Sequence, residues 1–207
     1  DGQRLVSDVG GVLAHMDESW SWPAQDVVDQ VWPGTQTPRH DLILRERCLP
    51  HVIWVDRKGQ RFVNESSHNC ALAFASLAST SVAHSPRSEH PPAWAIVDSQ
   101  FRSRYPFAGA APGGDLPEQV IQAPSLDSLA QATGIDGVGL RQTIERFNQM
   151  VVGGRDLDFQ RGEAAYDRYY GDPEAAHPNL GSIAQAPFYA LPVRAGLVGT
   201  KGGGSTD

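Results

Sequence analysis

The sequence lacks runs of basic residues, long apolar stretches and an opening signal segment. Its 207 residues include 17 Lys and Arg against 24 Asp and Glu, for a formal net charge of -7. Nucleic-acid binding depends on clustered Lys and Arg, so no nucleic-acid partner is predicted. No stretch approaches the roughly 20 consecutive apolar residues that cross a bilayer. We therefore expect a soluble protein without a membrane span, in a cytoplasmic setting, that acts on a small partner.

Cysteine is scarce, and a dinucleotide fingerprint is missing. Cys48 and Cys70 are the only cysteines, and two do not make a disulfide framework in a chain of this size, so both are predicted to be reduced. Gly137-Val-Gly139 resembles the start of G-x-G-x-x-G, but it opens a predicted helix, follows no strand and lacks the third glycine. No segment is therefore predicted to cradle the pyrophosphate of a dinucleotide.

The residues that are present predict a mixture of helices and strands. Hydrophobic residues make up 40% of the chain and charged residues 20%, which is typical of one folded globular domain. Helical spacing and capping residues predict four helices. They are an opening helix through Leu5, Val9 and Leu13 interrupted at Gly10-Gly11, a buried helix at 70–77, a short helix from Ser125 to Ala132 that stops at Gly134, and a longer helix after Asp136 with an apolar stripe of Leu140, Ile144, Phe147 and Val151.

Strands are predicted where β-branched and apolar residues run together. A hairpin is expected from 51–55 and 61–63 around the polar turn 56–59, with further strands at 93–97 and 188–193. Pro, Gly and Ser clusters predict irregular segments at 17–39, 79–92, 107–117, 153–187 and the glycine-rich 199–204. Strands and helices do not alternate as βαβ units, so the predicted class is α+β.

Eight short segments, in this order, resemble one flavoprotein family. They are Asp1-Gly-Gln3 with Gly10-Gly-Val12 and Trp20-Ser-Trp-Pro23, 55–65, 94–98 with 104–107, Thr143 to Asn148, 158–162, 166–173, Pro187-Phe-Tyr-Ala190 and Gly199-Thr-Lys-Gly-Gly203. Each segment alone is weak, but the ordered set is similar to FAD-dependent oxidoreductases of the fumarate reductase and succinate dehydrogenase flavoprotein superfamily. Segments 166–173 and 199–203 most resemble the 3-ketosteroid dehydrogenase branch.

This resemblance implies a two-domain enzyme, of which the chain holds mainly the substrate-binding cap. Residues 1–18 would be the end of a helix of the FAD domain, 19–186 the cap, and 187–207 a strand and glycine-rich loop that return to the FAD domain. The Rossmann-type domain that binds most of the FAD would lie outside this chain. The expected partners are the remainder of the parent enzyme and a small hydrophobic ketone, and the fragment alone is expected to be inactive.

The resemblance also suggests residues for chemistry next to a ketone. Tyr189 resembles the tyrosine of the family's Phe-Tyr-Ala segment, and its phenol would donate a hydrogen bond to the ketone or relay a proton. The alternative is a tyrosine packed in a strand. Gly199, Thr200, Gly202 and Gly203 resemble a loop that passes close to the flavin, where glycines let backbone amides approach a ligand. The alternative there is a frayed chain end.

Further candidates would border the substrate. Asn64 and Glu65 resemble the family's Asn-Glu motif, and His68 lies where the ketosteroid branch has a tyrosine, so it would act as acid or base, or else be an exposed loop histidine. Trp20 and Trp22 would line an apolar slot, unless they are core residues. No metal site is assigned among these candidates.

Two other functions stay open at this point. A fumarate reductase-like enzyme acting on a small unsaturated acid would need paired cationic side chains, whereas only Arg194 lies near the final loop. A non-catalytic metal or partner-binding module would use Cys48, His51, His68 and Cys70 as zinc ligands, although the second pair is spaced tightly for a zinc motif.

Overall fold

A six-stranded antiparallel sheet organises the protein. The computed structural model describes residues 2–16, 18–36, 38–74, 77 and 93–205. The strand order is β3 (Pro38–Leu42), β2 (Ser19–Val31), β7 (Phe188–Thr200), β5 (Ala93–Asp98) and β4 (Val52–Val55), and β6 (Ile121–Ala123) also pairs with β7. Every strand pair in these described ranges is antiparallel. The predicted mixture of helix and sheet is confirmed.

The helices begin and end largely where their capping residues predict. Ser125 accepts a hydrogen bond from the Ser128 amide at the start of α4 (Leu126–Thr133), which ends at Gly134 in the left-handed region. Asp136 caps α5 (Gly137–Val152) in the same way. The remaining helical segments are α1 (Gly2–Asp8), α3 (Ser99–Arg104), α6 (Ala165–Tyr169) and the 3-10 turns η1 (Glu46–Cys48) and η2 (Cys70–Ala73).

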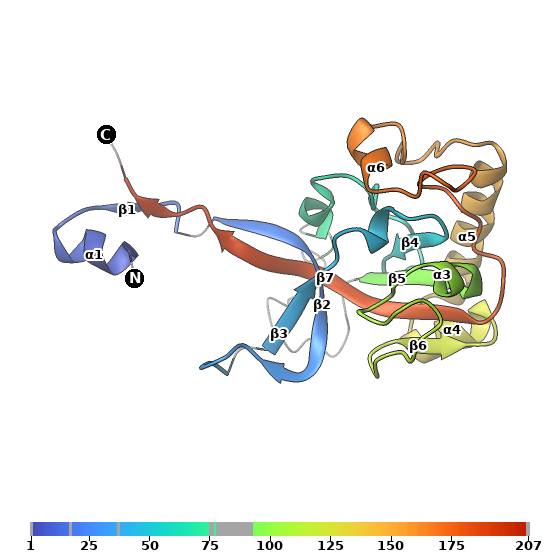
Figure 1. The fold of residues 1–207 in the computed structure, drawn as a ribbon, viewed down its shortest axis with the longest axis horizontal. Coiled ribbons are helices and arrows are strands. Elements are labelled where there is room, and N and C mark those ends of the chain that lie inside the picture. Colours follow the sequence, from blue (N-terminus) through green and yellow to red (C-terminus); the bar gives the residue numbers. More distant parts are fainter. Residues whose placement is uncertain (1, 17, 37, 75–76, 78–92, 206–207) are drawn as a thin grey trace.

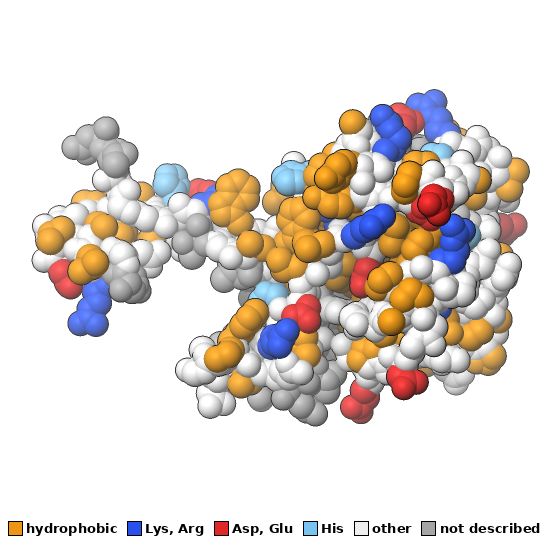
Figure 2. Space-filling model, in the orientation of Figure 1, with side chains coloured by type: hydrophobic (Ala, Val, Ile, Leu, Met, Phe, Trp, Pro, Cys, Tyr) orange, Lys and Arg blue, Asp and Glu red, His pale blue; other side chains and the backbone are white. Residues whose placement is uncertain are grey.

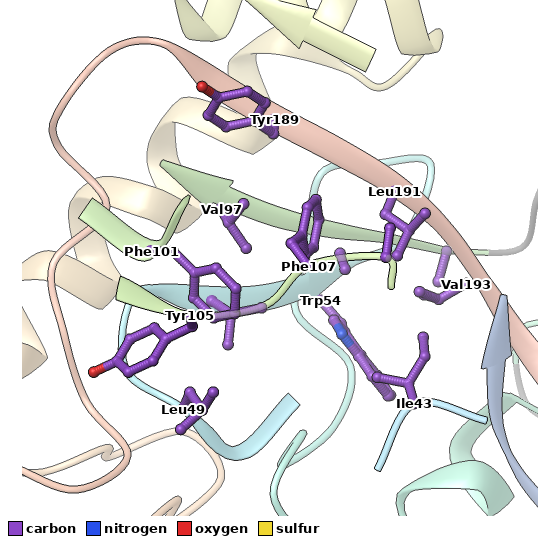
Figure 3. Close-up of a cluster of buried hydrophobic side chains, with 14 of the residues drawn as sticks. Ile43, Leu49, Trp54, Val97, Phe101, Tyr105, Phe107, Tyr189, Leu191 and Val193 are labelled. Atoms are coloured by element: carbon purple, nitrogen blue, oxygen red, sulfur yellow. The ribbon is translucent and has the colours of Figure 1, made fainter. Parts of the chain in front are cut away.

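The central strands are buried on both faces, so each face of the sheet has its own core. Alternate residues of a strand point to opposite sides. On β4, Trp54 therefore packs into one cluster with Phe101 and Leu191, and Ile53 packs into the other with residues of α4 and α5. Figure 3 shows the first cluster. The α5 stripe is confirmed at Leu140, Ile144 and Phe147, and Met150 completes it while Val151 is only half-buried.

A long two-stranded arm leaves this body, as Figure 1 shows. β2 and β7 pair from Ser19↔Thr200 to Ala24↔Arg194, with a register shift between Trp20 and Ser21. At the tip, β1 (Leu13–Ala14) pairs with β8 (Gly203–Gly204), and both chain ends lie there beside α1. The tip therefore joins residues that are almost 200 positions apart in sequence.

The prediction of an irregular segment at 17–39 was wrong, because most of it forms β2 and β3. Prolines and tryptophans gave turn signals, but β7 supplies hydrogen-bonding partners from about 170 residues away. The predicted strand 188–193 is likewise longer than expected, and the glycine-rich segment is partly strand. Long-range pairing decided these segments, which local sequence does not reveal.

Two other predictions are partly met, and a third is untested. The turn 56–59 closes with the Gly59 amide donating to the Asp56 carbonyl at 3.0 Å, but Arg61 makes only a single bridge to Val55, and the strand partner of β4 is β5. Of the helix predicted at 70–77, Cys70–Ala73 form a 3-10 turn with Leu72 exposed, and Phe74 and Leu77 are α-helical. The loop predicted at 79–92 lies outside the described residues.

Candidate functional site

The predicted glycine segment forms the end of the arm, next to Trp20. Gly199 pairs with Trp20 across β2 and β7, and Gly203 pairs with Ala14 at the tip. The Trp20 side chain is 62% exposed, and the Lys201 ammonium stands 5.0 Å from the centre of its ring. The structure thus brings together one predicted substrate residue and the predicted cofactor segment.

A row of aromatic rings continues from Trp20 onto the body. Trp20 and Trp22 are two residues apart on β2, with the register shift between Trp20 and Ser21 lying between them. The Trp22 ring lies 5.6 Å from His68, and the His68 ring lies 5.1 Å from Tyr166, both edge to face. We call Trp20, Trp22, His68 and Tyr166 the aromatic row. Figure 2 shows hydrophobic side chains gathered where the arm joins the body.

Tyr189 lies at the opposite end of β7. Ten residues separate it from Gly199, which corresponds to roughly 33 Å of extended strand. Its side chain is 8% exposed and belongs to the first core cluster, and Figure 3 shows its hydroxyl pointing away from that cluster. It lines a surface cavity of about 610 Å³ together with Arg102 and Glu118. Tyr189 and the glycine segment therefore cannot contact the same small ligand.

Glu65 belongs to a buried ion-pair network. Its carboxylate is paired with Arg61 at 2.9 Å and Arg161 at 3.2 Å, and it accepts the Trp54 amide at 3.0 Å. Although burial disfavours the ionised form, the charges of Arg61 and Arg161 hold the pKa of Glu65 below its usual range. Because Glu65 is fully buried, it cannot contact a substrate. We therefore assign it a role inside the fold and not in substrate binding.

Asn64 is also engaged in holding loops together. Its Nδ2 donates to Asp167 at 2.9 Å, and its Oδ1 accepts the Ser66 amide at 2.9 Å. Asp167 in turn accepts the Gly162 amide at 3.0 Å. Asn64 thus ties the segment that precedes His68 to α6, which carries Asp167 and Tyr166.

The four proposed zinc ligands do not converge in the structure. No group of three or more His, Cys, Asp or Glu side chains is placed to hold a metal within the described residues. His51 Nδ1 lies 2.6 Å from the Ser182 carbonyl, and His68 packs between Trp22 and Tyr166. Cys48 and Cys70 are buried and free, as predicted. The zinc alternative therefore lacks a ligand set.

The backbone at the start of α5 is already in contact with other parts of the protein. A Cβ on Gly139 would stand 1.9 Å from the Lys58 carbonyl oxygen, and the Asp136 carboxylate accepts the Gly139 amide at 2.7 Å. A pyrophosphate needs these same backbone donors to be free. Gly137-Val-Gly139 is thus a packing site, in line with its failure to match the dinucleotide fingerprint. Over the described ranges, no helix has the length and hydropathy needed to cross a membrane.

A family model described as "FAD binding domain" matches residues 1–207, and the chain belongs to this family. FAD is the cofactor of the family. The resemblance noted in the ordered sequence motifs is confirmed.

Individual relatives agree with this assignment. The 3-oxosteroid 1-dehydrogenase of Mycolicibacterium smegmatis is 38% identical over the whole chain, which spans 36% of that protein's length. A fumarate reductase of Shewanella frigidimarina is 28% identical, and the chain spans 30% of its length. Among solved structures, a 3-ketosteroid delta1-dehydrogenase of Sterolibacterium denitrificans, in complex with 1,4-androstadiene-3,17-dione, has a TM-score of 0.83 at 35% identity over 99% of this chain and 36% of its own.

Two glycines at the arm end leave open space beside the backbone, and a third is packed. No atom lies within 4 Å of the place that a Cβ would take on Gly199 or Gly203, so both positions leave open space beside the backbone. A Cβ on Gly202 would stand 2.5 Å from the His15 carbonyl oxygen, so this glycine is required by packing at the tip. The described residues therefore provide an open glycine edge without a phosphate-binding turn.

Alanine substitutions should separate these two uses of glycine. Gly202→Ala is expected to cost about 1–3 kcal/mol of unfolding free energy, because its Cβ meets backbone that cannot move away cheaply. Gly203→Ala should change stability by less than about 0.5 kcal/mol. If the flavin lies against this edge, Gly203→Ala will instead weaken FAD binding. Urea unfolding and flavin fluorescence titration measure the two effects, and equal destabilisation by both substitutions would contradict this assignment.

Proposed function

We propose that this chain is the substrate-covering part of an FAD-dependent dehydrogenase that acts on a CH–CH bond next to a ketone. A 3-ketosteroid is the substrate class that fits best. When bound, FAD supplies the acceptor for the hydride that leaves the substrate. This chain then contributes an apolar wall, polar groups that face the ketone, and a glycine edge beside the cofactor.

The aromatic row is the observation that carries this proposal. It begins beside the glycine segment at Trp20 and ends at Tyr166, so a substrate on it would lie next to a flavin held at the arm. Flat, largely apolar rings match a fused-ring ketone, because ligand sites are mostly apolar with a few placed polar groups. His68 is exposed within the row. We propose that it acts as the base that accepts the proton leaving the carbon next to the ketone.

The predicted residues divide into two groups under this proposal. Trp20, Trp22, His68, Gly199, Thr200 and Gly203 belong to the site or its cofactor edge, and Gly202 shapes the tip. Asn64 and Glu65 support the site from inside the fold. Tyr189 remains a prediction, and its role toward a ketone would require the substrate to enter the cavity beside Arg102 instead.

Exposed apolar side chains at the arm tip support a further body of protein around it. Leu5, Val9 and Val12 are 66%, 84% and 69% exposed, and α1 has no buried residue. Clusters of this kind on a soluble protein mark contact surfaces. The remainder of an FAD enzyme, joined through segments 1–18 and 187–207, is the proposed occupant.

A fumarate reductase-like activity is less well supported. Binding two carboxylates requires cationic donors that are free to pair with them. Arg194 is instead hydrogen-bonded to Asp26, and Lys201 lies near Glu18 at 3.7 Å while covering Trp20. Arg194 and Lys201 thus already have partners within the protein.

Anaerobic flavin reduction distinguishes the two activities. The complete FAD-loaded enzyme that carries this chain should lose its oxidised flavin absorbance when mixed with a saturated-ring 3-ketosteroid. The same enzyme, chemically reduced first, should not be reoxidised by fumarate. Fumarate-dependent reoxidation without bleaching by the ketosteroid would reverse the assignment. No bleaching by the ketosteroid together with no reoxidation by fumarate would exclude both substrates.

A further inference from the structure

The Tyr189 hydroxyl faces a surface cavity from a packed position. The residue is 8% exposed, and its ring belongs to the first core cluster, while its hydroxyl points away from that cluster (Figure 3). Tyr189 lines a cavity of about 610 Å³ whose walls are α3, the segment 113–120 and β6. Within the described residues, the hydroxyl forms no hydrogen bond. A deeply packed phenol normally has a partner, so this hydroxyl is available to a molecule that enters the cavity.

Most hydrogen-bond donors on the α3 wall of the cavity are used within the protein. The Ser99 and Ser103 hydroxyls donate to backbone carbonyls at 3.0 and 2.9 Å. Nη1 and Nη2 of Arg102 donate to backbone carbonyls at 2.8 to 3.4 Å. A serine hydroxyl has one proton, so only its lone pairs remain once it donates. The α3 wall therefore offers mainly acceptors to a ligand.

The opposite wall carries two carboxylates without a cationic partner. Asp115 and Glu118 line the cavity, and neither side chain forms an ion pair or hydrogen bond in the part of the chain that the structure describes. The amides of Gly113 and Gly114 on this wall donate within the fold, at 2.8 and 3.0 Å. With the guanidinium of Arg102, the two carboxylates give the lining one net negative charge. Such a lining attracts a cation.

We infer that this cavity binds a small organic cation, whose ammonium or guanidinium group donates hydrogen bonds to Asp115, Glu118 and the Tyr189 hydroxyl oxygen. Hydrogen bonds between charged donors and carboxylates are stronger than those between neutral groups. A phenol oxygen can accept a hydrogen bond as well as donate one. The volume lies within the range of small-molecule sites. This site is separate from the aromatic row, and the inference goes beyond the proposed function.

The hydrogen-bonding pattern narrows the class of cation. Over the described ranges, no group of three or more His, Cys, Asp or Glu side chains is placed to hold a metal, so a metal ion lacks a ligand set here. A quaternary ammonium ion has no N–H to donate to the acceptors. A ketone is only an acceptor, and most donors on these walls are already used. A primary ammonium or guanidinium group therefore matches the lining best.

Calorimetric titration of the complete FAD-loaded enzyme that carries this chain tests the inference. Butylammonium and butylguanidinium chlorides, added at constant ionic strength, should each bind in a single saturable step. Butanol has no charge, and tetramethylammonium has no N–H donor. Both should bind about tenfold more weakly or not at all.

Substitutions locate the binding site. Glu118→Gln should weaken butylguanidinium binding by about tenfold, and Tyr189→Phe by about fivefold. The matched controls are Glu145→Gln on the exposed side of α5 and Tyr169→Phe at a side chain that is 80% exposed, and neither should change the affinity. Because the Tyr189 hydroxyl has no partner among the described residues, Tyr189→Phe should leave thermal unfolding unchanged. Weaker binding by this variant then reports the lost hydroxyl.

Three outcomes would overturn the inference. The first is the absence of saturable binding by both cations. The second is equal weakening by Glu118→Gln and Glu145→Gln, which would indicate attraction to the overall negative charge of the protein and not to a site. The third is competition between butylguanidinium and a 3-ketosteroid, which would place the substrate in this cavity and not along the aromatic row.

Discussion

Glu65→Gln is expected to lower the free energy of unfolding by about 3–5 kcal/mol, because it leaves buried arginines without their counter-charge. Arg161 is fully buried, and Glu65 is the only acidic group with which it forms an ion pair in the described residues. Arg61 would keep its ion pair with Asp156 at 2.9 Å. The substitution would therefore mainly leave Arg161 without an acidic partner. Urea denaturation of the protein measures the change.

The matched control is an exposed ion pair. Glu163 pairs with Arg155 at 2.5 Å, with side chains that are 39% and 63% exposed. Glu163→Gln should cost no more than about 1 kcal/mol, because water already solvates both charges. A loss below about 1 kcal/mol for Glu65→Gln would mean that water or another carboxylate compensates Arg161, contrary to the network described.

Gly59→Ala should also destabilise the protein strongly, by about 2–5 kcal/mol in total. The residue has a φ of +71°, which costs an L side chain roughly 1–2 kcal/mol. The added Cβ would also stand 2.2 Å from the Leu140 amide nitrogen, at the place where the turn 56–59 packs on α5. Overpacking against backbone adds about 1–3 kcal/mol.

Alanine substitution of Gly154 separates the conformational cost of a positive φ from the cost of overpacking. Its φ is +69°, nearly the same as that of Gly59, but no atom lies within 4 Å of the position that an added Cβ would occupy. Gly154→Ala should therefore show only the conformational cost. Thermal and urea unfolding of both variants give the comparison, and similar losses at the two sites would refute close packing between the turn and α5.

Local features of the sequence predicted the parts of the fold that depend on neighbouring residues. Ser125, Gly134 and Asp136 mark the ends of α4 and α5 because capping involves groups within a few positions. The buried strand 93–97 was predicted for a similar reason, since its residues are apolar without interruption. β2 was missed, because its regular structure depends on hydrogen bonds to β7.

The residues of the candidate site also fall into those that local sequence identified and those that it did not. Trp20, Trp22, His68 and the glycine segment were identified from motifs, and the structure places them on or beside one surface. Tyr166 was noted within a motif but not as a site residue, since its contact with His68 spans about 100 positions. Glu65 was assigned to substrate because the motif alone does not reveal that Arg61 and Arg161 enclose it.

The sequence by itself determined the family, through eight ordered motifs, and the helices whose ends are marked by short-range capping. Only the tertiary structure decided which of the motif residues share a surface. Pairing of β2 with β7 carries the glycine segment to Trp20, and folding of α6 against the body brings Tyr166 to His68. The reason is physical: strand pairing and ring packing join groups far apart in the chain, and no local pattern encodes their partner.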